Sequence, residues 1–206
     1  IAQDHKRIFD GDAGPNTGGM GAYTPVPQIP EEAVQQAISQ VLKPTAKGMV
    51  AEKRPFQGIL YAGLIQTATG PKVIEFNARF GDPETQVVLA RLESLLSEII
   101  SSLLVKEQPT IAWNELASVG VVVAAEGYPN QYKTNLPLPE MSGETIYYAG
   151  VTRSEQALVS AGGRIFLAEA TASTLEEARK KVYQTLDNYS FPGMYYRKDI
   201  GVKGLI

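Results

Sequence analysis

Three polar residues at alternate positions carry the groups that phosphoryl transfer requires. Glu75, Asn77 and Arg79 fall in residues 72–79, a run rich in β-branched and aromatic residues that predicts one strand. Side chains two positions apart share a strand face, roughly 7 Å apart, so we expect all three to point the same way. Carboxylate and amide oxygens suit a hard cation, and a guanidinium suits a phosphate or carboxylate. The pattern is therefore typical of a phosphoryl-transfer site.

Neighbouring features favour this interpretation over an ordinary strand with one solvated face, which would show the same alternation. The turn at residues 81–84 adds the carboxylates of Asp82 and Glu84 directly after the strand. Earlier, residues 11–21 contain five glycines, and we call this segment the glycine loop. Glycine permits positive φ and close backbone approach, so we expect N–H groups of this loop to form an anion-binding nest. The loop is neither a P-loop nor a dinucleotide-binding fingerprint.

Together these motifs resemble the glycinamide ribonucleotide synthetase family (phosphoribosylamine–glycine ligases), which are ATP-grasp enzymes of purine biosynthesis. The matching residues are Asp4–Arg7 with Gly14–Tyr23, and Val73–Gln86. The similarity continues through residues 58–64, 117–125 and 197–201, so it covers nearly the whole chain.

The resemblance implies an α+β fold. Residues 1–105 would form the C-terminal part of an ATP-grasp domain, a mostly antiparallel sheet with helices that holds the metal, phosphate and substrate site. Residues 106–206 would form a small α/β C-terminal domain of the rudiment single hybrid motif type, packed against it. Members of this family are longer, so an N-terminal domain and an ATP lid would precede residue 1, and we expect this chain to be inactive alone. Its end shortly after Gly201 favours a stand-alone parent enzyme.

The activity implied is ATP-dependent ligation of glycine to 5-phosphoribosylamine, which gives glycinamide ribonucleotide, ADP and phosphate through a glycyl phosphate. ATP and Mg²⁺ or Mn²⁺ would be the cofactors. Glu75 and Asn77 would bind the metals that bridge the ATP phosphates, and Arg79 would be the catalytic residue that neutralises the transferring phosphoryl group. Many ATP-grasp enzymes carry a second metal-binding acid on the preceding strand. Residues 58–64 contain no acid, which leaves the number of metals open.

Five residues of the two motifs are the candidate substrate-binding residues: Asp4, Lys6, Gly18, Gly19 and Asp82. Asp4, Lys6 and the loop glycines would hold phosphoribosylamine or glycine. Asp82 is the candidate for the glycine ammonium group. For His5, a buried loop histidine and a catalytic base are about equally favoured.

Composition excludes several other classes of protein. The chain has 206 residues, with 19 Lys and Arg against 22 Asp and Glu, so a net charge of −3 gives no electrostatic case for nucleic acid. The absence of cysteine excludes disulfides and thiolate metal sites. No apolar run reaches the length of a membrane helix. This composition agrees with a cytoplasmic enzyme. The resemblance implies partners that are the small molecules ATP, glycine and phosphoribosylamine, and we expect a monomer.

Two other functions remain open. One is an ATP-grasp ligase or carboxylase that acts on a different purine intermediate by the same phosphoryl chemistry. The other is a non-catalytic binding remnant, against which the intact Glu-x-Asn-x-Arg pattern argues. Purified substrates separate these functions, because only the ligase of the resemblance needs both glycine and phosphoribosylamine.

Periodicity and turn residues also predict the elements that position these residues. Two helices are expected at the N-terminal side, residues 30–53, kinked or ended by Pro44, and residues 84–105. A hairpin joins residues 58–66 to 72–79, and residues 105–110 form a linker. Further strands are expected at 118–125, 144–152 and 164–172, the last paired with 157–160 through Gly162-Gly163. A capping box at Ser173 or Thr174 begins a helix that runs through Asn188.

Overall fold

The computed structural model describes residues 1–142, 145–155 and 157–206. It forms two compact units that interleave along the chain. We call them the sheet unit (residues 1–26, 82–93 and 113–206) and the hairpin unit (residues 27–81 and 94–112). These units are not two consecutive segments of sequence. The division into domains 1–105 and 106–206 stays a prediction.

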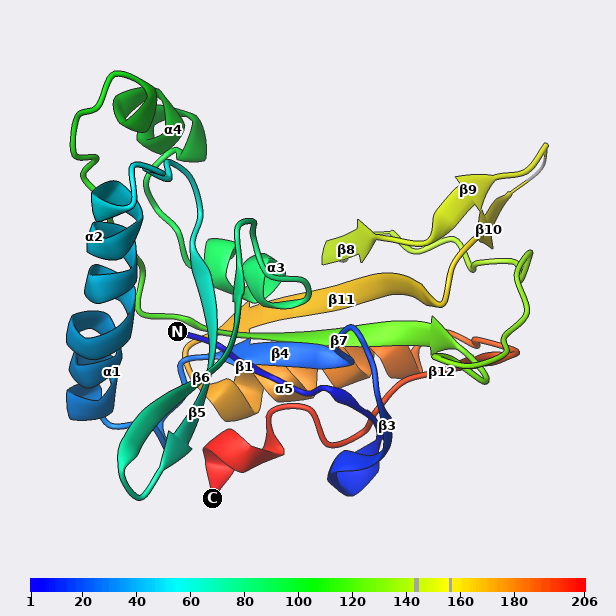
Figure 1. Ribbon diagram of the computed structural model, residues 1–206. Coiled ribbons are helices and arrows are strands. Elements are labelled where there is room, and N and C mark those ends of the chain that lie inside the picture. Colours follow the sequence, from blue (N-terminus) through cyan, green and yellow to red (C-terminus); the bar gives the residue numbers. More distant parts are fainter. Residues whose placement is uncertain (143–144, 156) are drawn as a thin grey trace. The chain divides into compact units, whose positions relative to one another are not determined.

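The sheet unit is built on one antiparallel sheet (Figure 1). Its strand order is β1-β4-β7-β11-β8, with β12 also pairing with β7. Every pairing within it is antiparallel, as the resemblance implies. The strands are β1 (Gln3–Asp4), β4 (Gly21–Thr24), β7 (Ala117–Ala125), β8 (Thr145–Tyr148), β11 (Arg164–Ala172) and β12 (Met194–Tyr195).

The core of the sheet unit lies around β7, because all nine residues of this strand are buried. Its continuous small and β-branched sequence is typical of a strand covered on both faces. Helix α5 (Leu175–Asp187) packs on β7 and β11, and α3 (Glu84–Leu89) packs on β4 and β7. Figure 1 shows α5 running alongside these central strands.

Helix α5 forms as the sequence predicts. Its N-cap Thr174 accepts a hydrogen bond from the Glu177 N–H at 3.2 Å, which confirms the capping box, and Asn188 is its C-cap. The side chains that face the sheet recur three or four residues apart and are all buried: Leu175, Ala178, Val182 and Leu186.

Two small hairpins and a short helix complete the sheet unit. Strands β2 (Arg7–Phe9) and β3 (Ala13–Asn16) flank the 3-10 turn η1 (Asp10–Asp12), and the C-terminal 3-10 helix η3 spans Val202–Leu205. The other hairpin pairs β9 (Val151–Arg153) with β10 (Leu158–Ser160).

The predicted pairing of residues 157–160 with 164–172 is wrong, because β10 pairs with β9 instead. Backbone packing of two glycines explains the difference. The Gly162 N–H donates to the Gly150 carbonyl at 3.2 Å, and a side chain on Gly150 would lie 2.6 Å from the Arg164 carbonyl oxygen. The predicted strand 144–152 is likewise divided at Ala149 and Gly150 into β8 and β9; its first residue, Glu144, lies outside the described residues.

The hairpin unit contains the predicted first helix and hairpin. Residues 31–51 are helical throughout, as α1 (Glu31–Ala37), the π-helical turn η2 (Ile38–Leu42) and α2 (Lys43–Ala51). Pro44 therefore does not end the helix. The widened turn, in which the Lys43 N–H donates to the Ile38 carbonyl, comes where a proline at 44 would otherwise clash with the preceding turn. Strands β5 (Tyr61–Thr67) and β6 (Gly70–Asn77) form the hairpin.

The single helix predicted for residues 84–105 is wrong. It is two helices, α3 in the sheet unit and α4 (Leu96–Leu104) in the hairpin unit. The chain leaves α3 near Arg91, whose carbonyl accepts the Asn114 N–H at 2.9 Å, and Leu92 forms a β-bridge with Trp113. Pairing with a distant segment replaces the helical hydrogen bonds here, and local periodicity carries no record of it.

Candidate functional site

Glu75 and Asn77 lie near the end of β6, where both pair with β5. Glu75 is opposite Gly63 and Asn77 is opposite Tyr61. Because Gly63 has no side chain, Glu75 lies across it: a Cβ on Gly63 would be 3.1 Å from Glu75 Cγ. The register also shifts next to this pair, leaving Ile74 between the paired Val73 and Glu75, and such bulges redirect the side chains beside them.

Arg79 lies beyond the strand, because β6 ends at Asn77 rather than at residue 79. Its Nη1 donates to the carbonyl of the next residue, Phe80, at 2.8 Å. Strand alternation therefore aligns Glu75 with Asn77 but does not set the direction of Arg79. The guanidinium is exposed.

The donor set of β6 fits a hard cation in part. Glu75 and Asn77 offer a carboxylate and an amide oxygen, which are ligands that Mg²⁺ accepts. In the described part of the chain, no ion pair or side-chain hydrogen bond engages either residue, and no three His, Asp or Glu side chains gather as a metal-ligand set. The two residues would therefore fill part of a coordination sphere and leave the rest to phosphate oxygens and water.

The glycine loop lies in the sheet unit, where protein acceptors already engage its N–H groups. Gly18 N–H donates to Tyr128 Oη at 3.0 Å and Gly19 N–H to Thr17 Oγ1 at 2.9 Å. The Thr17 and Met20 N–H groups donate to carbonyls of the preceding segment at 2.7 and 2.8 Å. These four consecutive N–H groups therefore do not form the open anion nest that the glycine content suggested. Gly18 and Gly19 as substrate-binding residues stay predictions.

Gly19 and Gly21 are required by the backbone and by close packing. Gly19 has φ +118°, and a Cβ there would lie 2.4 Å from Pro83 Cδ. A Cβ on Gly21 would lie 2.6 Å from the Gly120 carbonyl oxygen. The loop thus packs directly on the turn that contains Asp82 and on β7.

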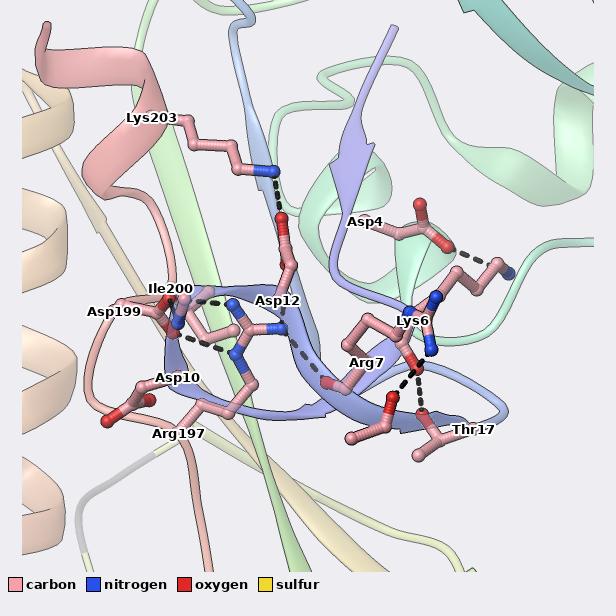
Figure 2. A network of polar contacts seen from close by, with 12 residues as sticks. Asp4, Lys6, Arg7, Asp10, Asp12, Thr17, Arg197, Asp199, Ile200 and Lys203 are labelled. Atoms are coloured by element: carbon pink, nitrogen blue, oxygen red, sulfur yellow. Dashed lines mark hydrogen bonds and ion pairs between the residues drawn. The ribbon is translucent and has the colours of Figure 1, made fainter.

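Asp4 and Lys6, both predicted to bind substrate, form an ion pair with each other. Lys6 Nζ lies 2.7 Å from Asp4 Oδ2. Figure 2 shows the two side chains pointing toward one another. The Lys6 side chain is 43% exposed and that of Asp4 17% exposed, so the pair meets solvent mainly through the lysine.

Asp82 faces Arg164, a residue that sequence reasoning did not select. Arg164 Nη2 lies 3.2 Å from Asp82 Oδ2, and Nη1 donates to Oδ1 at 3.2 Å and to the Asp82 carbonyl at 3.0 Å. The same Nη1 also donates to the carbonyls of Gly18 at 3.1 Å and Gly19 at 3.4 Å. Three of the five predicted substrate-binding residues therefore meet at one guanidinium.

A second network, of hydrogen bonds and ion pairs, connects the start of the glycine loop to residues 197–203 (Figure 2). Arg197 is fully buried, and its Nε and Nη2 each lie 2.7 Å from a carboxylate oxygen of Asp199. Its Nη1 donates to Asp12 Oδ1 at 3.0 Å and to the Arg7 carbonyl at 2.9 Å. Lys203 also pairs with Asp12.

The two carboxylates of this network titrate at low pH. Burial alone would raise the pKa of Asp12, but hydrogen bonds from Lys203 and Arg197 hold that pKa below its usual value. Burial likewise opposes ionisation of Asp199, yet hydrogen bonds from Arg197 and the Gly11 N–H hold its pKa far below the ordinary value. Both carboxylates are ionised near neutral pH.

His5 is hydrogen-bonded through its backbone to Met20 and Gly21 of the glycine loop, and it is 1% exposed. Burial, reinforced by the positive charges of Arg197 and Lys203, lowers its pKa to about 4. The ring packs 5.8 Å from that of Tyr23, and neither ring nitrogen has a hydrogen-bond partner in the described part of the chain. His5 is therefore neutral near pH 7.

The residues that sequence reasoning missed left some signal. Arg197 and Asp199 fall in the closing segment that carries the family resemblance, but nothing local shows that they reach residues 185 or more positions away. Arg164 follows Gly162-Gly163, which sequence reasoning took only as a turn.

No helix among the described residues has the length and apolar character to cross a membrane.

Two family models match the chain. The ATP-grasp (A) domain of phosphoribosylglycinamide synthetase matches residues 1–85, and the C domain of the same enzyme matches residues 118–203. Among curated proteins, the chain is 54% identical to phosphoribosylamine–glycine ligase of Halalkalibacterium halodurans, over 99% of this chain and 49% of that protein. It is 53% identical to the ligase of that name from Lactococcus lactis, over 100% of this chain and 50% of that protein. The chain spans about half the length of the curated relatives it matches.

Solved structures are similar as well. The crystal structure of phosphoribosylamine–glycine ligase from Thermotoga maritima matches with a TM-score of 0.88 and 34% identity, over 96% of this chain and 50% of that one. The biotin carboxylase domain of Hydrogenobacter thermophilus 2-oxoglutarate carboxylase matches with a TM-score of 0.62 and 16% identity, over 86% of this chain and 40% of that one. The second likeness concerns the fold alone. The family model at residues 1–85 and the Thermotoga maritima structure confirm the ATP-grasp type of fold.

Proposed function

The chain belongs to the phosphoribosylglycinamide synthetase family, and from this premise we propose that the complete protein ligates glycine to 5-phosphoribosylamine at the expense of ATP. One observation carries the proposal. The Glu75-x-Asn77-x-Arg79 pattern is intact in a chain about half of whose residues are identical to those of ligases named for this reaction.

The proposed reaction has two steps. A carboxylate oxygen of glycine attacks the γ-phosphorus of ATP, the bond to the β-phosphate oxygen breaks, and ADP leaves with the electron pair. The amine nitrogen of phosphoribosylamine then attacks the carbonyl carbon of glycyl phosphate. Phosphate leaves with the carboxylate oxygen, the nitrogen loses a proton, and glycinamide ribonucleotide forms.

The first step brings two anions together, which sets what the protein must supply. Two unit charges 4 Å apart repel by about 1 kcal/mol in water and by about 4 kcal/mol at an effective dielectric of about 20. A bound divalent cation would supply charge neutralisation at the ATP phosphates. Glu75 and Asn77 are the residues that would hold it, as Mg²⁺ or Mn²⁺, and Arg79 would neutralise the transferring phosphoryl group.

The candidate substrate residues of the sheet unit complete the proposal. Asp82 would accept the ammonium group of glycine. Lys6, whose side chain is nearly half exposed beside Asp4, would meet an anionic part of a substrate, and Gly18 and Gly19 would contribute backbone at close approach. A cytoplasmic, monomeric enzyme with only small-molecule partners remains part of this proposal.

A different purine intermediate as substrate is the competing function, because the phosphoryl chemistry would be the same. A non-catalytic remnant is disfavoured by the intact polar pattern on and after β6. The domain division 1–105 and 106–206 also stays a proposal, which the matches at 1–85 and 118–203 support.

The test is substrate dependence in the complete enzyme, with ADP release as the readout. We expect ADP release and formation of glycinamide ribonucleotide to need both glycine and phosphoribosylamine. Release that depends instead on another purine intermediate would favour the competing function. This chain by itself serves as the control, and we expect it to show weak or absent ATPase activity, since the proposed ATP lid lies outside it.

A further inference from the structure

Arg164 joins two segments that sequence reasoning assigned separately to substrate binding. From β11, its Nη1 donates to the Gly18 carbonyl at 3.1 Å and its Nη2 lies 3.2 Å from Asp82 Oδ2. Nη1 also donates to Asp82 Oδ1 at 3.2 Å. A guanidinium is planar and carries five N–H donors in a fixed geometry. One rigid group therefore sets the distance and the angle between the glycine loop and Asp82.

The glycines around this contact leave room for it. A Cβ on Gly18 would lie 3.0 Å from Arg164 Cζ, so a side chain there would push the guanidinium away. A Cβ on Gly163 would lie 2.2 Å from the ring of Tyr128, whose Oη accepts the Gly18 N–H at 3.0 Å. Neighbouring residues 163 and 164 thus support both polar groups of the peptide backbone at Gly18.

Asp82 keeps free capacity for a ligand while held in this way. A carboxylate has about four lone-pair positions. Arg164 occupies one on each oxygen, and Gln86 Nε2 approaches Oδ1 at 3.3 Å. The side chain remains 48% exposed. Its remaining lone pair is therefore accessible and has a fixed direction, whereas an unpaired surface carboxylate would rotate among several.

We propose that Arg164 is a positioning residue for glycine binding: it orients the Asp82 carboxylate and the backbone at Gly18 and Gly19 toward the glycine ammonium group. This inference rests on the proposed function, which assigns glycine as a substrate and Asp82 as its ammonium acceptor. Lysine is no substitute, because a single ammonium on a flexible stem cannot reproduce the planar two-point contact with Asp82.

The kinetic test compares Arg164→Ala and Arg164→Lys in the complete enzyme. Arg153→Ala is the matched control, since Arg153 is an exposed arginine on β9 of the same unit. We expect Arg164→Ala to raise the KM for glycine about tenfold and Arg164→Lys to raise it severalfold, with the KM for ATP changed less than twofold in each. A purely structural role would instead lower kcat through a smaller folded fraction and leave every KM unchanged. That result would overturn the inference.

A second measurement is independent of activity. Amide hydrogen exchange in residues 17–21 reports whether Arg164 holds the loop. We expect exchange there to become about tenfold faster in both Arg164 variants and to be unchanged in Arg153→Ala. Unchanged exchange in the Arg164 variants would overturn the inference whatever the kinetics. Should the wild-type enzyme show no glycine dependence while loop exchange still responds to Arg164, the proposed function fails, and with it the role in glycine binding, but not the contact itself.

Discussion

The glycine loop and the Glu75–Arg79 segment differ in how completely this chain satisfies their polar groups. In the loop, the N–H groups of four consecutive residues have protein acceptors, and Arg164 binds the carbonyls of two of these residues. On β6, by contrast, no described side chain pairs with Glu75 or Asn77. Buried polar groups need partners, and exposed ones are free for ligands. The polar groups of the loop are therefore satisfied by other residues of this chain, whereas the side chains of Glu75 and Asn77 are available to bind a cation.

The hairpin and the sheet unit also differ in how far their apolar residues are buried. Ile74 is 67% exposed and Ile65 53% exposed, although their types favour burial. Both edges of β5 and β6 lack further strands among the described residues. A two-stranded hairpin is marginal in water without a covering layer. In the sheet unit, by comparison, β7 is buried along its whole length.

The largest expected effect is the loss of activity when Glu75 of the hairpin unit is changed. Glu75→Gln in the complete enzyme removes the proposed carboxylate ligand and keeps the shape of the side chain. We expect kcat/KM to fall about 10³-fold, or about 4 kcal/mol, because the charge at the phosphates is then less well neutralised. Glu98→Gln, an exposed acid on α4 of the same unit, is the control. Full magnesium-dependent turnover by Glu75→Gln would end the metal assignment.

The next effect is on the stability of the sheet unit. Arg197→Met keeps an apolar stem but strips Asp199 and Asp12 of a fully buried partner. Removing one member of a buried ion pair is strongly destabilising, so we expect a loss of about 3 kcal/mol in the free energy of unfolding. Chemical denaturation measures it, with the exposed Lys180→Met on α5 as the control. A loss no greater than that of the control would show that the pairs contribute little.

This effect has a defined pH dependence. The pKa of Asp12 and that of Asp199 are lowered in the folded state, so their contribution is present above about 3.8, the ordinary Asp value, and declines as pH falls through the folded pKa. The stability difference between wild type and Arg197→Met should therefore be constant near neutral pH and shrink below about pH 3.8.

The smallest effect comes from His5, whose pKa is lowered from 6.5 to about 4 on folding. As pH decreases, His5 therefore becomes protonated in the unfolded state at a higher pH than in the folded state. The free energy of unfolding falls as pH decreases from 6.5 toward 4. We expect a loss of about 1 kcal/mol between pH 6.5 and 5.5 that is absent in His5→Gln. Denaturation of both proteins at each pH measures the difference. Parallel pH profiles for the two would contradict a neutral buried His5.

The sequence pattern correctly predicted those elements that are determined by neighbouring residues. The apolar run of β7, the amphipathic stripe and cap of α5 and the β5–β6 hairpin are each encoded in a few neighbouring residues, and all are confirmed. The continuous helix over residues 84–105 is wrong because the bridge between Leu92 and Trp113 is a long-range contact. The predicted pairing of residues 157–160 with 164–172 is wrong because the close packing of Gly150 and Gly162 determines which strand pairs with β10.

The candidate site divides in the same way. Residue types indicated the glycine loop as a site of close backbone approach, which the packing at Gly19 and Gly21 confirms. They also indicated Glu75 and Asn77 as candidate cation ligands, and that assignment stays a prediction. The partners of the loop could not be predicted, since Tyr128, Arg164 and Arg197 lie more than 100 residues along the chain from the loop residues that they contact. Composition indicates that a backbone is adaptable, but only the folded structure shows which side chains occupy its donors and acceptors.

Oxygen transfer from glycine to phosphate tests the proposed reaction most directly. The complete enzyme is given ATP, phosphoribosylamine and glycine labelled with ¹⁸O in its carboxylate, and the phosphate released is analysed by mass spectrometry. Attack by the carboxylate on the γ-phosphorus predicts one ¹⁸O atom in each phosphate formed. Unlabelled phosphate, released while glycinamide ribonucleotide accumulates, would contradict a glycyl phosphate and the assignment of the phosphoryl-transfer residues to its formation.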